Sequence, residues 1–121
     1  MTRVLKSLSE IASDYDAIIL DQWGVLHDGS AAYPGTAAAL KHLMARGTRL
    51  AVLSNSGKRA APNRARIAAM GFSSGLFDCV MTSGEALWRD IANGTIPERR
   101  FFPVERTKGD ARAWASDLAI D

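Results

Sequence analysis

Cysteine is nearly absent from this sequence: Cys79 is the only one among 121 residues. A single thiol excludes an intramolecular disulfide and any zinc site built from several cysteines. Chains without disulfides are typical of a reducing compartment. We therefore expect a cytoplasmic protein in which Cys79 lies in the core.

Long apolar runs and a strong net charge are also missing. No apolar stretch approaches the roughly 18 residues of a membrane span, and residues 1–11 are amphipathic rather than signal-like. Lys and Arg number 15 against 13 Asp and Glu, which gives a formal net charge of +2, and the basic residues form no run. Neither a membrane nor a nucleic acid is therefore expected as a partner.

The glycine patterns of nucleotide-binding proteins are absent as well. The chain has 10 glycines, but its expected strand-to-helix turns contain neither the Gly-x-Gly-x-x-Gly fingerprint nor the phosphate-loop Lys-Ser/Thr signature. Dinucleotides and nucleoside triphosphates are therefore poor candidates as ligands.

The sequence does contain a short apolar run, residues 17–20, which leads into Asp21 and is followed by breaks at Gly24 and Gly29. Such a run predicts a strand buried on both faces of a parallel sheet. Ligands of open parallel sheets lie beyond the carboxyl ends of the strands, which is where Asp21 falls. A half-buried carboxylate is costly without a partner, so this position predicts a metal, a cation or a reaction.

The rest of the chain repeats the alternation of strand and helix. Strands are expected near residues 17–21, 49–53 and 79–82, and helices over 37–46, 62–70 and 82–92. This order predicts an α/β fold with a parallel sheet and right-handed crossovers, with the first strand beside the second.

Further elements are expected at the two ends of the chain and at two helix starts. Apolar spacing predicts a helix over residues 3–11, and the C-terminal part suggests a strand over 101–104 and a helix over 110–118. Thr36 is a candidate helix cap. Thr82 and Glu85 have the spacing of a capping box.

All three expected strands end in polar residues: Asp21, then Ser54-Asn55, then Thr82-Ser83. One such ending is weak evidence, because strand ends are usually polar, and Ser54 and Asn55 could be turn formers only. Three polar endings at the same edge of one sheet predict a site.

These residues carry a resemblance. The stretch from Asp21 to Gly29 resembles the first motif of the haloacid dehalogenase-like (HAD) phosphohydrolases, and residues 53–56 resemble their second motif. The Pro34-Gly35 turn and the stretch 82–85 are similar to class IIA, the sugar-phosphatase and p-nitrophenyl-phosphatase-like branch. The resemblance implies a Rossmann-like HAD core, with residues 1–92 as the first part of the core and 93–121 as the beginning of the cap.

The resemblance also implies roles for individual residues. Asp21 matches the nucleophile, which also binds Mg²⁺, and the position of Trp23 normally supplies a backbone carbonyl to that metal. Ser54 matches the hydroxyl that binds the phosphoryl oxygens, with Asn55 beside it, and the N–H groups of Trp23 and Gly24 would be further donors. The implied reaction is Mg²⁺-dependent hydrolysis of a small phosphorylated metabolite through an aspartyl-phosphate.

Two departures from the family pattern bear on activity. Trp23 stands where the family has its general acid, and an indole N–H does not exchange a proton at neutral pH. General acid–base help is worth about 10²–10⁴ in rate, and His27 and Asp28 are the alternative donors because both lie on the loop that leaves the site. The lysine and acidic motifs that the family carries later in its sequence are also missing after Phe101.

We therefore expect no phosphatase activity from this chain by itself. The alternative is a degenerate homologue that binds phosphate or a protein partner without turnover. The missing motifs suggest a truncated product or a domain completed by another copy. In either case the first strand has a bare edge. The chain is then expected to form a homodimer through that edge, to gain order only with its missing half, or to be poorly soluble.

Overall fold

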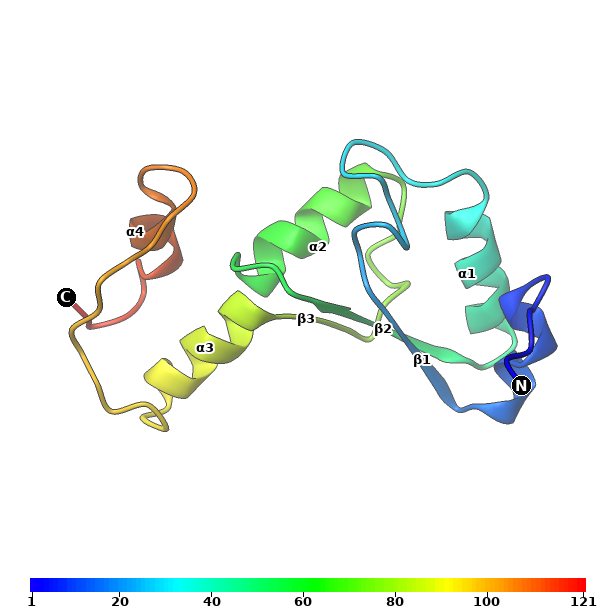
Figure 1. Ribbon diagram of the computed structural model, residues 1–121, viewed down its shortest axis with the longest axis horizontal. Helices are drawn as coiled ribbons and strands as arrows, with labels where there is room; N and C mark the ends of the chain where they lie inside the picture. The colour runs from blue at the N-terminus through cyan, green and yellow to red at the C-terminus, as the bar shows by residue number, and fades with distance from the viewer.

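The structure is a computed structural model that describes residues 1–121. It confirms the predicted α/β fold, in which strands and helices alternate from residue 17 to residue 92 (Figure 1). The strands are β1 (Ala17–Leu20), β2 (Arg49–Ser54) and β3 (Cys79–Thr82), and the helices are α1 (Thr36–Ala45), α2 (Ala60–Ala69), α3 (Ser83–Ala92) and α4 (Asp110–Trp114).

The three strands form one parallel sheet in the order β1-β2-β3. Leu20 lies beside Val52, and Ser54 lies beside Thr82. The first strand is thus next to the second, as predicted, and its other edge is unpaired. All three strands end at the same edge, so the loops that leave them are neighbours.

One face of the sheet packs on α1 and α2, which lie on the same side of it (Figure 1). Alternate strand residues point into this core, because successive side chains of a strand point to opposite faces. The core residues of the strands and of the two helices are Leu20, Leu50, Val52, Val80, Leu40, Leu43 and Ile67. No helix is long and apolar enough to cross a membrane.

The other face of the sheet is largely uncovered, and it corrects two predictions. Ile19 is 68% exposed and Leu53 57% exposed, so β1 and β2 are not buried on both faces. Cys79 is exposed rather than in the core. The reason is that Cys79 alternates with the buried Val80 and shares the uncovered face with Ile19 and Leu53, over which no helix lies.

The N-terminal helix predicted over residues 3–11 is wrong. Residues 8–10 and 12–14 form two short 3₁₀ turns. The Glu10 carboxylate accepts the N–H groups of Lys6 (2.7 Å) and Ser7 (3.2 Å). This side chain caps a short turn that begins at Ser7, so residues 3–6 lie outside it and the continuous helix that the apolar spacing suggested does not form.

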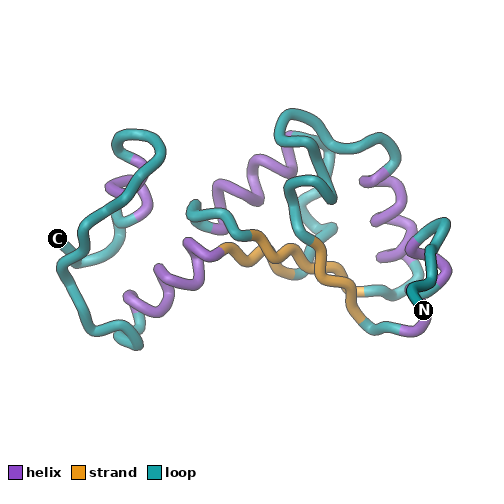
Figure 2. Tube along the Cα trace, in the orientation of Figure 1, coloured by secondary structure: helices purple, strands orange, loops and turns teal.

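Three smaller predictions are also wrong. Gly35, with φ +79°, takes the cap position of α1, and Thr36 is the first helical residue. Residues 101–104 form no strand, because the Phe101 N–H donates one hydrogen bond to the Asp121 carbonyl (2.9 Å) and the segment meets no sheet edge. Helix α4 ends at Trp114 rather than near residue 118. The final segment lies apart from the sheet, beyond α3 (Figure 2).

Candidate functional site

Asp21 directly follows β1 at the carboxyl edge of the sheet, and Ser54 ends the neighbouring strand. The last paired row is Leu20 with Val52, so Asp21 lies one residue and Ser54 two residues beyond it, on strands about 4.8 Å apart. Both predicted residues therefore lie at the carboxyl edge of adjacent strands. Asp21 is exposed and forms no ion pair; one carboxylate oxygen accepts its neighbour's N–H, from Gln22, at 2.6 Å.

The loop after β1 is shaped by its own backbone. The carbonyl of Gln22 accepts three N–H groups, including that of Leu26 at 2.8 Å, and the N–H of Gly24 donates to the carbonyl of His27 at 2.9 Å. Gly24 has φ +81°, which favours glycine. The predicted role of the Gly24 N–H as a phosphate donor stays a prediction, and in this structure that N–H is engaged within the loop.

Trp23 packs against its own loop. Its ring lies so close to Gly29 that a Cβ there would come within 2.7 Å and 2.8 Å of two ring atoms. The Arg66 guanidinium lies 6.0 Å from the ring centroid and donates to the Gly29 carbonyl at 2.6 Å. The residue as a whole nevertheless remains 65% exposed, so Trp23 covers one side of the loop while much of its surface is open to solvent.

The structure disfavours both alternative proton donors. His27 is only 1% exposed, and its Nδ1 accepts the N–H of Gly29 at 3.0 Å, so the proton of the neutral ring is on Nε2, which has no partner. Burial, and next the charge of Arg66, lower the pKa of His27. The N–H groups of Ala31 and Ser30 lower the pKa of Asp28. At neutral pH, His27 is therefore neutral and Asp28 ionised.

The loop after β2 is joined to the loop after β1 by buried side chains. Gln22 and Asn63 are 3% and 5% exposed. Gln22 Nε2 donates to Asn63 Oδ1 at 3.4 Å, and Asn63 Nδ2 donates to Ser56 Oγ at 3.3 Å and to the Arg59 carbonyl at 2.9 Å. These contacts fix the spacing between the two loops.

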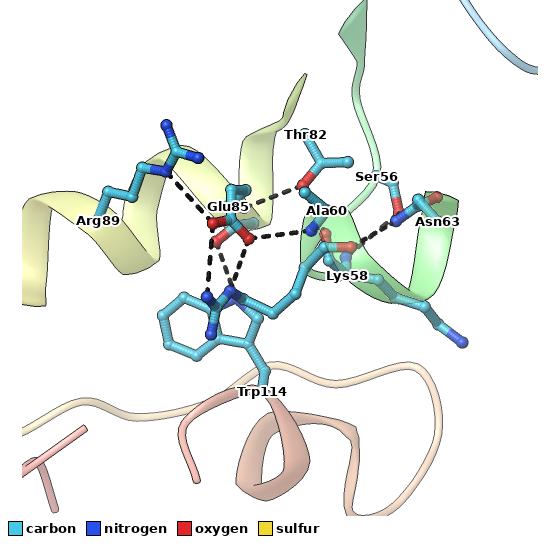
Figure 3. Close-up of polar contacts among 10 residues, drawn as sticks. Ser56, Lys58, Ala60, Asn63, Thr82, Glu85, Arg89 and Trp114 are labelled. Carbon is cyan, nitrogen blue, oxygen red and sulfur yellow. Dashed lines mark hydrogen bonds and ion pairs between the residues drawn. The ribbon is translucent and has the colours of Figure 1, made fainter. Parts of the chain in front are cut away.

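Glu85 provides a further set of contacts beside the β2 loop (Figure 3). Its carboxylate, 9% exposed, accepts Arg59 Nε at 2.7 Å, the Ala60 N–H at 3.0 Å and Arg89 Nε at 3.3 Å. The hydrogen bond from Arg59 is the main cause that lowers the pKa of Glu85 to about 2. Thr82 caps α3 as predicted, by accepting the Glu85 N–H at 3.0 Å. The Glu85 side chain does not complete the capping box, because it turns to α2 instead.

Magnesium fits the donor set only in part. No group of three or more His, Cys, Asp or Glu side chains could hold a metal ion. The oxygen ligands that the resemblance implies are the Asp21 carboxylate and the Trp23 carbonyl, and Mg²⁺ is often held by one or two carboxylates together with water and substrate phosphate. Mg²⁺ binding by Asp21 and the Trp23 carbonyl therefore stays a prediction.

The site contains three residues that the sequence analysis did not single out: Gln22, Asn63 and Arg59. The 41-residue separation of Gln22 and Asn63 gives no local signal. A weak signal was present for Asn63, because a polar side chain in the middle of a helix that packs on a sheet requires a partner when it is buried.

Comparisons with known proteins agree with this geometry. The sequence profile of the haloacid dehalogenase-like hydrolases matches residues 18–109. A hydrolase of the haloacid dehalogenase-like family from Brucella suis 1330, known from its crystal structure, superposes with a TM-score of 0.78 at 29% sequence identity. The match covers 98% of this chain and 42% of that one, so the chain spans less than half the length of that hydrolase. No curated protein sequence matches this chain.

Proposed function

The chain belongs to the haloacid dehalogenase-like hydrolase family, and from this premise we propose that it carries the nucleophile of a class IIA phosphomonoesterase site. The observation that carries the proposal is the position of Asp21: exposed, without an ion-pair partner, and beside Ser54 at the carboxyl edge of a parallel sheet. The substrate class is a small phosphorylated metabolite.

In the proposed reaction an Asp21 carboxylate oxygen attacks the phosphorus atom while the bond from phosphorus to the ester oxygen breaks. The Ser54 hydroxyl donates to a phosphoryl oxygen, and water then hydrolyses the aspartyl-phosphate and restores the carboxylate. Asp21 and the Trp23 carbonyl would hold Mg²⁺, which supplies positive charge next to the phosphoryl oxygens. A carboxylate and a phosphate repel each other unless such charge and such donors are present.

The proposed reaction lacks a general acid to protonate the leaving group. The Trp23 side chain is not an acid at neutral pH, and His27 is buried. Asp28 accepts two N–H groups, which favour its ionised form. With no group to protonate a departing alkoxide, we expect no hydrolysis of an alkyl phosphate such as glycerol phosphate above background by this 121-residue chain. The same observation favours the second candidate function, a non-catalytic member of the family that binds phosphate or a protein partner.

Binding of inorganic phosphate in the presence of Mg²⁺, followed by titration calorimetry, tests the proposal. Asp21→Asn should lower the affinity because it removes a charged Mg²⁺ ligand, and Ser54→Ala should lower it about tenfold through the loss of one hydrogen bond to a charged group. Asp117→Asn is the matched control, because Asp117 is exposed and lies far along the chain. Equal affinity for the wild type and Asp21→Asn would remove Asp21 from the site.

The free edge of β1 is the second part of the proposal. Strand β1 pairs only with β2, and Ile19 beside that edge is 68% exposed. An unpaired apolar edge favours association, and we propose that two copies of the chain pair there. Sedimentation at micromolar concentration should show a concentration-dependent dimer. A monomer in which the β1 amides are protected from hydrogen exchange would contradict it.

A further inference from the structure

The last residue of β3 and the first turn of α3, residues 82–85, each form a hydrogen bond with the loop after β2. This Thr82–Glu85 turn and the loop segment Asn55–Ala60 run side by side at the carboxyl edge of the sheet (Figure 3). The contacts are Thr82 Oγ1 to the Lys58 carbonyl (2.6 Å), Ser83 Oγ to Asn55 Oδ1 (3.0 Å), the Gly84 N–H to the Ser56 carbonyl (3.0 Å) and the Ala60 N–H to Glu85 Oε2 (3.0 Å).

Gly84 lies too close to the loop for any side chain. A Cβ at this position would collide with the Gly57 carbonyl oxygen and lie 2.5 Å from the Gly57 carbon and 2.9 Å from the Lys58 carbonyl oxygen. The obstacle is backbone, which cannot rotate away as a side chain does. The glycine is therefore required for the close approach of two backbone segments rather than for its conformation.

Thr82 does more than cap a helix. Its hydroxyl is fully buried, accepts the Glu85 N–H, and donates its own proton to the Lys58 carbonyl. A cap alone would need only the first of these two bonds. Because a hydroxyl can donate and accept at the same time, this single atom ties the start of α3 to the β2 loop.

The Arg59–Glu85 ion pair lies at the C-terminal end of this loop, where α2 begins. Arg59 lies over the Trp88 ring, with its guanidinium carbon 3.7 Å from the ring centroid, and its side chain is 23% exposed. A charge pair this well covered is screened less by salt than a surface pair. It holds the start of α2 against α3, directly after the loop.

We propose that the Thr82–Glu85 turn is a positioning element for the phosphoryl-binding loop: it holds Asn55–Ala60 in the conformation that presents Ser54 and its neighbours to a phosphate. This inference rests on the proposed function. None of the four turn residues is assigned a contact with phosphate. Their effect passes through backbone groups of the loop, and the side chain of Ser83 reaches the predicted phosphate-site residue Asn55 itself.

The first experiment compares two glycine-to-alanine variants of the full chain. In Gly84→Ala, amide hydrogen exchange at residues 60 and 84, whose N–H groups donate across the contact, should be at least about tenfold faster, because these hydrogen bonds are lost. Affinity for inorganic phosphate with Mg²⁺ should fall by a similar factor. Gly75→Ala is the matched control, since a Cβ there meets nothing within 4 Å and should change neither quantity.

A second set of variants covers the case in which Gly84→Ala fails to fold. Thr82→Val removes the hydroxyl at nearly constant volume and should weaken phosphate binding about tenfold, the loss of one buried hydrogen bond and the exposure of its partner. Thr82→Ser keeps the hydroxyl and should restore wild-type affinity. Glu85→Gln should also weaken binding, whereas Glu98→Gln, at an exposed carboxylate, should not.

The outcomes separate this inference from the function on which it rests. Failure of the wild type to bind phosphate would overturn the proposed function, and the positioning role with it. If the wild type binds phosphate and Thr82→Val and Glu85→Gln bind it equally well, the positioning role alone is overturned. Weakened binding in Thr82→Val with recovery in Thr82→Ser supports the role when unfolding curves show that both variants are fully folded at the temperature of the titration, because the loss of affinity then does not come from unfolded chain.

Discussion

The two loops that would form the site are held in different ways. The loop after β1 is held by its own residues: the Gln22 carbonyl accepts three N–H groups of the loop, and the Leu26 side chain of the loop is fully buried. The loop after β2 is held from outside, by the Thr82–Glu85 turn and by Asn63 of α2. The first loop is therefore a local structure, and the second depends on a segment more than 20 residues away.

This difference predicts which substitutions and conditions disrupt the conformation of each loop. An internally anchored loop should lose its shape only when its apolar residue or its glycines are changed. A loop that is held by hydrogen bonds and an ion pair should respond to pH and to changes in α3. The following predictions test that contrast, from the largest expected effect to the smallest.

Leu26→Ala should have the largest effect on stability. The side chain is 0% exposed, and truncation of a buried leucine costs about 2–5 kcal/mol because it removes apolar contacts and leaves a cavity. Denaturant unfolding measures the loss. Leu87→Ala, at a leucine that is 44% exposed, is the control and should cost much less. Similar losses at both positions would show that Leu26 is not an anchor.

Acid should weaken the outer support of the second loop. The pKa of Glu85 is about 2 in the folded chain against an ordinary value of 4.5. Because the folded-state value is the lower one, the carboxylate adds stability above pH 4.5 that is lost as the pH falls toward 2. The contribution is at most roughly 3 kcal/mol at neutral pH.

Unfolding curves of wild type and Glu85→Gln between pH 2 and pH 7 measure this term. The two proteins should differ most at neutral pH and converge near pH 2. The deficit of Leu26→Ala should stay constant over the same range, because no titrating group is removed. A Glu85→Gln deficit that does not change with pH would contradict the assignment.

Gly29→Ala should destabilise the first loop by about 1–3 kcal/mol, the usual cost of a strained backbone conformation. Gly29 has φ +104°, and the new Cβ would meet the Trp23 ring. Trp23→Ala should remove the second of these two causes. Alanine at Gly29 should therefore cost less in the Trp23→Ala background, and a double-mutant cycle measures the difference. Additive costs would show that the ring does not press on Gly29.

The smallest effect should come from the bridge between the two loops. The bond from Gln22 to Asn63 is long, at 3.4 Å, but buried. A double-mutant cycle of Gln22→Ala and Asn63→Ala should give a coupling free energy of about 0.5–1.5 kcal/mol. A coupling near zero would mean that the loops are independent and that the α3 side alone fixes the second loop.

Much of the fold could be predicted because it depends on local patterns. The apolar runs that end in Asp21, Ser54 and Thr82 placed all three strands within a residue or two, and the parallel order followed from the helices between them. The N-terminal helix failed for a local reason too, since Glu10 caps a new turn at Ser7. Apolar spacing does not show such side-chain competition with the backbone.

Exposure could not be predicted in the same way. Ile19 and Cys79 belong to apolar strands, and burial on both faces is the usual outcome for a parallel sheet. Which face is covered depends on where the helices lie, and here α1 and α2 share one side. The alternation of side chains along the strand then decides that Leu20 is buried while Ile19 is not.

The sequence by itself determined the strands, the order of the fold and the place of Asp21, because strand formation and turn chemistry depend on neighbouring residues. Only the tertiary structure decided what holds the second loop. The bonds from Thr82 to Lys58, from Glu85 to Arg59 and from Gln22 to Asn63 join residues 24, 26 and 41 positions apart. Such contacts exist only once the sheet has brought the strand ends to one edge, so no local pattern records them.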